Sequence, residues 1–198
     1  MYDYIRGTLV ELNPADVTLE TGGIGYHILI SLTTYSSLQK GGKENVKLYL
    51  HQHLREDEEL LFGFFDKEER IMFRLLISVS GIGPGTARMM LSSMTPDEIS
   101  NAILTQDVNR IKSVKGIGMK TAQRVILELQ DKISKSASTA GFPFEGGAAP
   151  SPIRQEAATA LVLLGFTKPN VEKALNKLLK ENPSLSLEEL IKKALKLL

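Results

Sequence analysis

The chain of 198 residues contains no cysteine. This absence excludes disulfide bonds, thiolate metal ligands and cysteine nucleophiles, and it fits the reducing cytoplasm in which we expect the protein to work. No apolar run approaches the roughly 20 residues that a membrane-spanning helix needs, and the first residues lack the pattern of a secretory signal. We therefore expect no membrane partner.

The sequence also lacks a phosphate-binding loop of the G-x-x-x-x-G-K-[ST] type. The run Gly41-Gly42-Lys43 is followed by Glu44 and has no preceding glycine at the required distance. If the protein serves an ATP-driven process, a partner must hydrolyse the ATP. No pattern in the chain indicates a cofactor, a metal site or a set of catalytic residues, and we predict none of these.

The net charge of +1 conceals an uneven distribution. Residues 1–62 contain five lysines and arginines against nine acidic residues, whereas residues 63–140 contain eleven against eight. A polyanionic partner is therefore expected to prefer the middle of the chain, unless the acidic head is there to repel it.

Alternating apolar and polar residues predict five short strands in the first third of the chain. We place them at about 4–12, 16–21, 24–31, 45–53 and 58–65. A helix at about 32–39 interrupts them between the third strand and the fourth. This order favours a small Greek-key barrel of the OB type over residues 1–65.

From Asp66 onward the apolar period becomes that of helices, and residues 66–135 are expected to form four or five short ones. Asp66 followed by Glu69 resembles a capping box, and Thr95 with Glu98 is a clearer example.

Residues 136–150 are rich in Ser, Ala, Gly and Pro, which predicts a flexible linker. Residues 151–198 predict a three-helix bundle of the UBA-like type, whose last helix starts at Ser186 with Glu189 completing a capping box. The predicted fold class is thus multi-domain α+β.

The most informative feature is an internal repeat of the form V-x-G-I-G-x-x-T-A, at residues 79–87 and again at 114–122. Two glycines separated by one residue permit a tight turn. The helix that follows begins with free N–H groups and the positive end of its dipole, which together attract phosphate. Ile82 and Ile117, between the glycines, are expected to anchor each turn in the core.

Two such copies indicate the tandem helix-hairpin-helix motif of sequence-independent DNA-binding proteins, since a purely structural turn would not need to recur so closely. Basic side chains around the second copy add long-range attraction to phosphate, whereas the first copy has only one nearby. The candidate DNA contacts are Gly81, Gly83, Gly85, Thr86, Arg88, Lys115, Gly116, Gly118, Lys120, Thr121 and Arg124.

Three other functions share some of these features. A helix-hairpin-helix glycosylase can hold a catalytic lysine where Lys120 lies, but it needs a carboxylate well downstream, and Glu128 and Asp131 lie too early on the same helix. An accessory domain of a repair nuclease or glycosylase would need a carboxylate cluster or a pocket that the sequence does not reveal. A general single-strand binder would use exposed aromatics on the barrel, whereas the tyrosines and phenylalanines mostly fall at strand or core positions.

Taken in order, the barrel, the paired hairpins, the linker and the three-helix tail resemble the RuvA family, which binds Holliday junctions in bacterial recombination. The most telling local match is the run Leu54-Arg55-Glu56-Asp57, followed by residues 60–64. In that family the loop between the last two barrel strands carries two acidic residues, the acidic pin, which correspond here to Glu56 and Asp57. Family members often have lysines where this chain has Gly85 and Met119.

The resemblance implies a non-catalytic protein that holds four-way junction DNA open for branch migration in recombination and repair. It implies a homotetramer, or an octamer of two tetramers on one junction, with the hexameric RuvB ATPase as the motor and the RuvC resolvase as a further partner. The ATPase would dock on the C-terminal bundle, where Leu161 and Leu164 are the candidate contacts. Helical spacing of this kind also suits an ordinary core.

Overall fold

The computed structural model describes residues 2–137, 152–182 and 185–198. The chain divides into two compact units, Met1–Gly141 and Phe142–Leu198, and each is described by itself. The linker predicted at residues 136–150 falls almost wholly outside the described residues. The boundary predicted between barrel and helical block stays a prediction.

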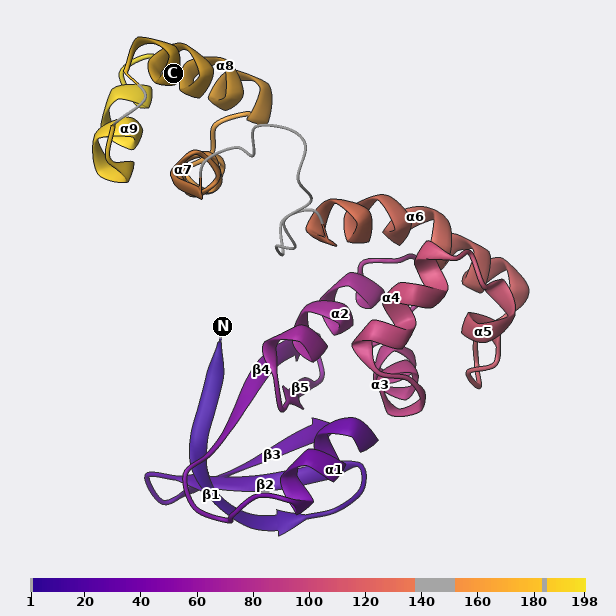
Figure 1. The fold of residues 1–198 in the computed structure, drawn as a ribbon. Helices are drawn as coiled ribbons and strands as arrows, with labels where there is room; N and C mark the ends of the chain where they lie inside the picture. Colours follow the sequence, from indigo (N-terminus) through magenta and orange to yellow (C-terminus); the bar gives the residue numbers. More distant parts are fainter. Residues whose placement is uncertain (1, 138–151, 183–184) are drawn as a thin grey trace. The chain divides into compact units, whose positions relative to one another are not determined.

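The first unit begins with a closed barrel (Figure 1). Its strands are β1 (Tyr4–Leu12), β2 (Asp16–Thr21), β3 (Ile24–Ile30), β4 (Val46–Leu54) and β5 (Glu59–Phe64), and α1 (Leu32–Gln39) lies between β3 and β4. The order around the barrel is β1-β2-β3-β5-β4, closed by antiparallel pairing of β1 with β4. The pair β3–β5 is parallel. The five predicted strands and the short helix are confirmed.

Alternation along the strands fills the barrel with aliphatic side chains, as the period-2 pattern predicts. Val17 and Leu19 on β2 are buried together with Ile28 on β3 and Leu48 on β4. The α1 helix begins at Ser31, whose hydroxyl accepts from the Thr34 N–H and satisfies one of the free donors of the first turn.

Five helices follow the barrel within the same unit: α2 (Lys67–Ile77), α3 (Pro84–Ser93), α4 (Pro96–Leu104), α5 (Val108–Lys112) and α6 (Met119–Ala137). They share one apolar core with the end of the barrel. The ring of Phe73 on α2 lies 5.1 Å from that of Phe62 and 4.9 Å from that of Phe64, both on β5. The helices are therefore held against the barrel by aromatic packing.

The predicted helix starts are confirmed at Thr95, where the capping box with Glu98 is complete. At Asp66 only half of the expected box forms. The Asp66 side chain accepts from the Glu69 N–H, but the Glu69 carboxylate turns inward and binds the hydroxyls of Ser31 and Thr34. Two buried donors on another element thus hold this carboxylate in place of the reciprocal capping contact.

The second unit contains α7 (Pro152–Leu163), α8 (Lys168–Glu181) and α9 (Leu187–Ala194), which pack around a small aliphatic core. The predicted capping box at Ser186 and Glu189 is complete. The expected three-helix bundle is confirmed. Among the described residues, no helix combines the length and apolar character needed to cross a membrane.

Candidate nucleic-acid interface

The two glycine turns adopt the same backbone conformation. Gly81 has a φ of +94° and Gly116 a φ of +90°, a region that glycine enters without the steric penalty of a Cβ atom. In each turn the isoleucine N–H bonds back to the valine carbonyl, at 3.0 Å from Ile82 to Val79 and at 3.1 Å from Ile117 to Val114. The repeat in sequence is therefore a repeat in structure.

The isoleucines between the glycines anchor the turns as predicted. Ile82 and Ile117 are each 5% exposed and belong to the core of the helical block. Their burial holds the glycines on either side at the surface of the unit. Both glycines of each turn, Gly81 with Gly83 and Gly116 with Gly118, are exposed.

Each turn leads into a helix whose first N–H groups are open. Gly83 is the N-cap of α3 and offers no side chain to accept from them. The Ala87 N–H bonds to the Gly83 carbonyl at 3.0 Å, and the Ala122 N–H bonds to the Gly118 carbonyl at 2.9 Å, so the first bond is the same in both helices. The open donors of α3 start at Gly85, because Pro84 at its first position has no N–H. Uncapped donors at the positive end of a helix dipole form a site for anions.

No described residue obstructs these helix starts. A Cβ atom built on Gly83, Gly85, Gly116 or Gly118 would meet no described atom within 4 Å. The same construction on Gly81 comes within 3.9 Å of the Thr121 side chain. The first turn therefore lies against the start of α6, and the two turns are neighbours.

The basic side chains divide into free and engaged groups. Lys115 and Lys120 are exposed, and among the described residues neither forms an ion pair or a hydrogen bond. Arg88 donates from Nη1 to the Ala15 carbonyl in the turn between β1 and β2, at 2.9 Å. Arg124 donates from Nη1 to the Ser80 carbonyl at 3.1 Å. Both guanidinium groups thus already donate to backbone carbonyls of the protein.

The hydroxyl residues at the two helix starts, Thr86 and Thr121, are partly buried at equivalent places of the repeat. The eleven predicted contacts thus lie on the two glycine turns and on the first two turns of α3 and α6. The arginine anchors were missed, because they join residues 73 and 44 positions apart. For Arg124 the sequence offers one indirect signal: the first copy of the repeat has Met89 at the corresponding position.

Glu56 and Asp57 lie at the tip of the turn between β4 and β5, the last two strands of the barrel. The turn is closed by a bond from the Arg55 N–H to the Glu58 carbonyl at 2.8 Å. Both predicted pin residues are exposed, as are the neighbouring Glu58 and Glu59. The carboxylates of Glu56, Asp57 and Glu58 in the turn, with that of Glu59 at the start of β5, therefore create a local negative potential.

One expected docking residue is corrected. Leu161 is 0% exposed and packs in the core of the C-terminal unit, because it lies on the face of α7 that meets α8 and α9. Leu164 is 61% exposed, and its neighbour Leu163 is 82% exposed. The apolar surface at this end of α7 thus contains Leu163 and Leu164, and not Leu161.

Some aromatic side chains of the barrel lie at its surface. Tyr2, Tyr4 and Phe65 are exposed, and the Lys47 ammonium lies 4.4 Å from the ring centre of Tyr4 and 4.5 Å from that of Tyr49. This cation–π arrangement stabilises the outer face of β1 and β4.

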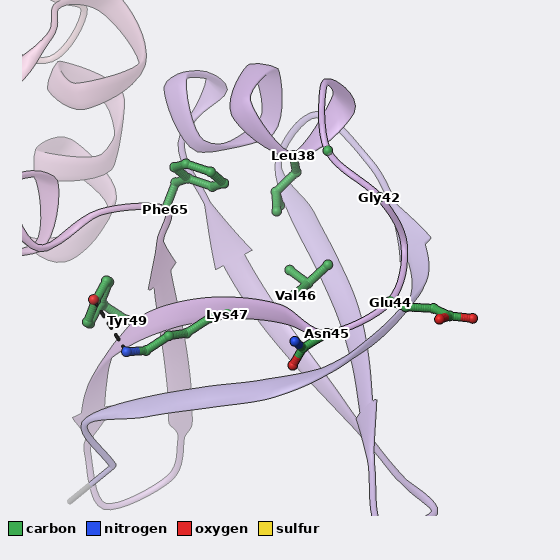
Figure 2. A pocket seen from close by; sticks show the side chains of 9 residues that line it. Leu38, Gly42, Glu44, Asn45, Val46, Lys47, Tyr49 and Phe65 are labelled. Carbon is green, nitrogen blue, oxygen red and sulfur yellow. Dashed lines mark hydrogen bonds between the residues drawn. The ribbon is translucent and has the colours of Figure 1, made fainter.

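A hollow of about 350 Å³ opens next to this face. Figure 2 shows Lys47 directed toward the Tyr49 hydroxyl, to which it donates at 3.4 Å, and Glu44 turned outward. Phe65 and Leu38 lie at the other side of the hollow. None of the predicted DNA contacts lines it, so the glycine turns remain the candidate interface.

Three family models match the chain in succession. Residues 1–63 match the RuvA N terminal domain, residues 73–131 match the SAM-like helix-hairpin-helix tandem, and residues 152–198 match the RuvA C-terminal domain. The second match covers both glycine turns.

Curated relatives match along the whole chain. The Holliday junction branch migration complex subunit RuvA of Cytophaga hutchinsonii is 52% identical over 200 residues, which covers 100% of both chains. The protein of the same name from Bacteroides thetaiotaomicron is 48% identical over 201 residues and 99% of both chains, and that from Porphyromonas gingivalis is 43% identical over 204 residues and 100% of both. Since full-length identity of this degree accompanies RuvA-specific matches on both sides of the tandem hairpins, the chain belongs to the RuvA family.

Proposed function

We propose that this chain binds four-way DNA junctions by their shape and holds them open for branch migration, without cutting the DNA. The observation that carries the proposal is the pair of neighbouring glycine turns, each leading into an uncapped helix start that is open to solvent. Such donors bind phosphate and sugar rather than base edges, so the binding is expected to depend little on sequence.

Lys115 and Lys120 support the same function by electrostatics. Both ammonium groups are exposed beside the second turn, so each can neutralise a phosphate without first breaking a contact in the protein. The first turn has no lysine of this kind, because Gly85 stands where the family often has one. Its share of the binding then depends on the backbone N–H groups of α3.

The acidic turn explains how a DNA-binding protein would prefer a junction to a duplex. Glu56 and Asp57 repel phosphate, so they penalise duplex DNA that lies across them. In a homotetramer, four such turns around one axis would meet the open centre of a junction, where the strands separate. An octamer of two tetramers would enclose the junction from both sides.

The motor and the nuclease of the process are assigned to partners. The chain has no phosphate-binding loop for ATP, and the relatives are named as subunits of a branch migration complex. We assign ATP hydrolysis to the hexameric RuvB ATPase, docked on the C-terminal bundle through Leu163 and Leu164. The RuvC resolvase is the proposed partner that cuts the junction, and the cytoplasm is the proposed compartment.

Gel-shift titrations with three DNAs of matched length, at one fixed salt concentration, test the proposal. We expect the immobile four-way junction to bind at least about tenfold more tightly than linear duplex, a difference of about 1.4 kcal/mol, and more tightly than single strands. Equal affinity for junction and duplex would overturn it. Preference for single strands would favour the alternative in which the exposed tyrosines of the barrel stack on bases.

A further inference from the structure

Arg124 connects the two hairpins of the interface. Its Nη1 atom donates to the Ser80 carbonyl at 3.1 Å, although the two residues are 44 positions apart. On its other side, Nε lies 4.0 Å from the Glu128 carboxylate one turn further along α6. The guanidinium is therefore held between its own helix and the turn of the other hairpin.

The acceptor of this bond, the Ser80 carbonyl, belongs to the peptide group that leads into the first glycine turn. Ser80 immediately precedes Gly81, which has a φ of +94°. The carbonyl and the N–H of a trans peptide point in opposite directions. With its carbonyl held by Arg124, the Ser80–Gly81 peptide directs the Gly81 N–H away from α6, and no described residue accepts from it.

Two further side chains of α6 lie close to the first hairpin. The Thr121 side chain lies 3.9 Å from a Cβ built on Gly81. Further along α6, the Lys132 ammonium donates to the hydroxyl of Ser78, the C-cap residue of α2, at 3.2 Å. Arg124 and Thr121 thus lie beside the first turn, and Lys132 lies beside the end of α2.

The repeat itself shows that this link runs in one direction only. When the two copies are aligned on their glycines, Met89 of α3 takes the place of Arg124, and Lys115 takes the place of Ser80. The side chain of methionine has no N–H to donate. The second hairpin therefore holds the first, and the first has no equivalent arginine with which to hold the second.

We propose that Arg124 is a positioning residue that fixes the spacing between the two phosphate-binding turns, and not primarily a phosphate contact. This inference rests on the proposed function and refines its list of DNA contacts. Two sites joined at a fixed spacing bind one DNA arm as a bivalent unit, because the second contact becomes intramolecular. Loss of the link would weaken binding while every phosphate contact remains available.

The test substitutes Arg124→Met, which introduces the residue of the first copy, beside Lys120→Met on the same helix as a matched control. Amide hydrogen exchange is measured on the protein without DNA, in peptides that cover residues 79–83 and 114–118. We expect Arg124→Met to accelerate exchange of the Ile82 N–H by about fivefold, the effect of losing one net hydrogen bond. Exchange of the Ile117 N–H should stay unchanged, and Lys120→Met should affect neither.

Junction affinity measured over a range of salt concentrations gives the second readout. Arg124→Met is expected to lower the affinity several-fold with no change in the slope of log K against log salt, whereas Lys120→Met should reduce that slope by about 0.9 for one lost phosphate contact. Arg124→Lys, which keeps a donor, should recover part of the exchange protection.

Unchanged exchange at Ile82 together with a reduced slope for Arg124→Met would overturn the proposal and make Arg124 a phosphate contact. If circular dichroism shows that Arg124→Met does not fold, Arg124→Gln carries the same expectations. Because the exchange measurement uses no DNA, it stays decisive even if the wild-type protein shows no preference for junctions. That result would overturn the proposed function and leave the link between the hairpins intact.

Discussion

The carboxylate of Glu69 on α2 accepts a hydrogen bond from the Thr34 hydroxyl on α1 at 2.6 Å. A second bond comes from the Ser31 hydroxyl. Each hydroxyl in turn accepts from a backbone N–H, that of Phe65 for Thr34 and that of Thr34 for Ser31. Glu69 is 1% exposed, so this network joins α1, α2 and the end of β5 in a region from which water is excluded, where such networks are strong when every member is satisfied.

The first prediction concerns the pH dependence of stability. Burial raises the pKa of the Glu69 carboxyl above its ordinary value of 4.5, although the bonds from Ser31 and Thr34 oppose the shift. The folded state then keeps a proton that the unfolded chain has already lost. Relative to Glu69→Gln, the wild-type free energy of unfolding should be highest below pH 4.5 and should decline as the pH rises through the raised pKa.

Urea unfolding of both proteins between pH 4 and pH 8 checks this expectation. Glu69→Ala serves as the disruptive comparison, because it leaves two buried hydroxyls without their acceptor and should lower the stability by roughly 2–4 kcal/mol. Parallel pH profiles for wild type and Glu69→Gln would contradict the prediction.

Local patterns in the sequence were sufficient for much of the fold. The period of apolar residues gives the strands, and the capping boxes at Thr95 and Ser186 mark helix starts, because both signals lie within a few residues of the backbone that they shape. The glycine turns could be predicted for the same reason, because the glycines that permit each turn lie within it. Left-handed backbone at Gly81 and Gly116 follows from the residue type and the helices on either side.

The features that the sequence did not reveal depend on tertiary contacts. Glu69 stands at the N3 position of α2, where a capping contact is expected, but the hydroxyl groups that it binds are 35 and 38 positions earlier. Leu161 and Leu164 have the same residue type, and which of them is buried depends on how α7 rotates against α8 and α9. Neither outcome can be derived from spacing alone.

The second prediction tests how closely DNA approaches the first turn. Gly83 has an ordinary extended conformation, and a Cβ there meets nothing within 4 Å, so Gly83→Ala should lower the stability by no more than about 1 kcal/mol. The added methyl group would keep phosphate from the N–H groups of α3, and we expect junction affinity to fall about tenfold. Gly42→Ala on the barrel, equally free of contacts, is the control, and loss of affinity there as well would remove Gly83 from the interface.

The third prediction concerns the acidic turn. The double substitution Glu56→Gln with Asp57→Asn removes two negative charges without changing side-chain size, so the repulsion of duplex phosphates decreases. We expect duplex affinity to rise about three- to tenfold at low salt, and the preference for junctions to shrink by the same factor. Competition gel shifts measure both, with Glu20→Gln on the exposed side of the barrel as the control. An unaltered preference would reduce the turn to an ordinary solvated hairpin tip.

The last prediction distinguishes the leucine that stabilises the C-terminal unit from the leucines proposed to bind the ATPase. Leu161→Ala should create a cavity and destabilise this unit by roughly 2–5 kcal/mol, since the side chain is fully buried. Leu163→Ser with Leu164→Ser should leave the melting temperature nearly unchanged, because both side chains are exposed, yet reduce binding of the RuvB hexamer severalfold through lost apolar contact. Calorimetric melting and pull-down with purified RuvB measure the two effects, with Val162→Ser as the control for general loss of apolar surface on α7. If the double variant binds RuvB as tightly as wild type does, the ATPase docks elsewhere on the bundle.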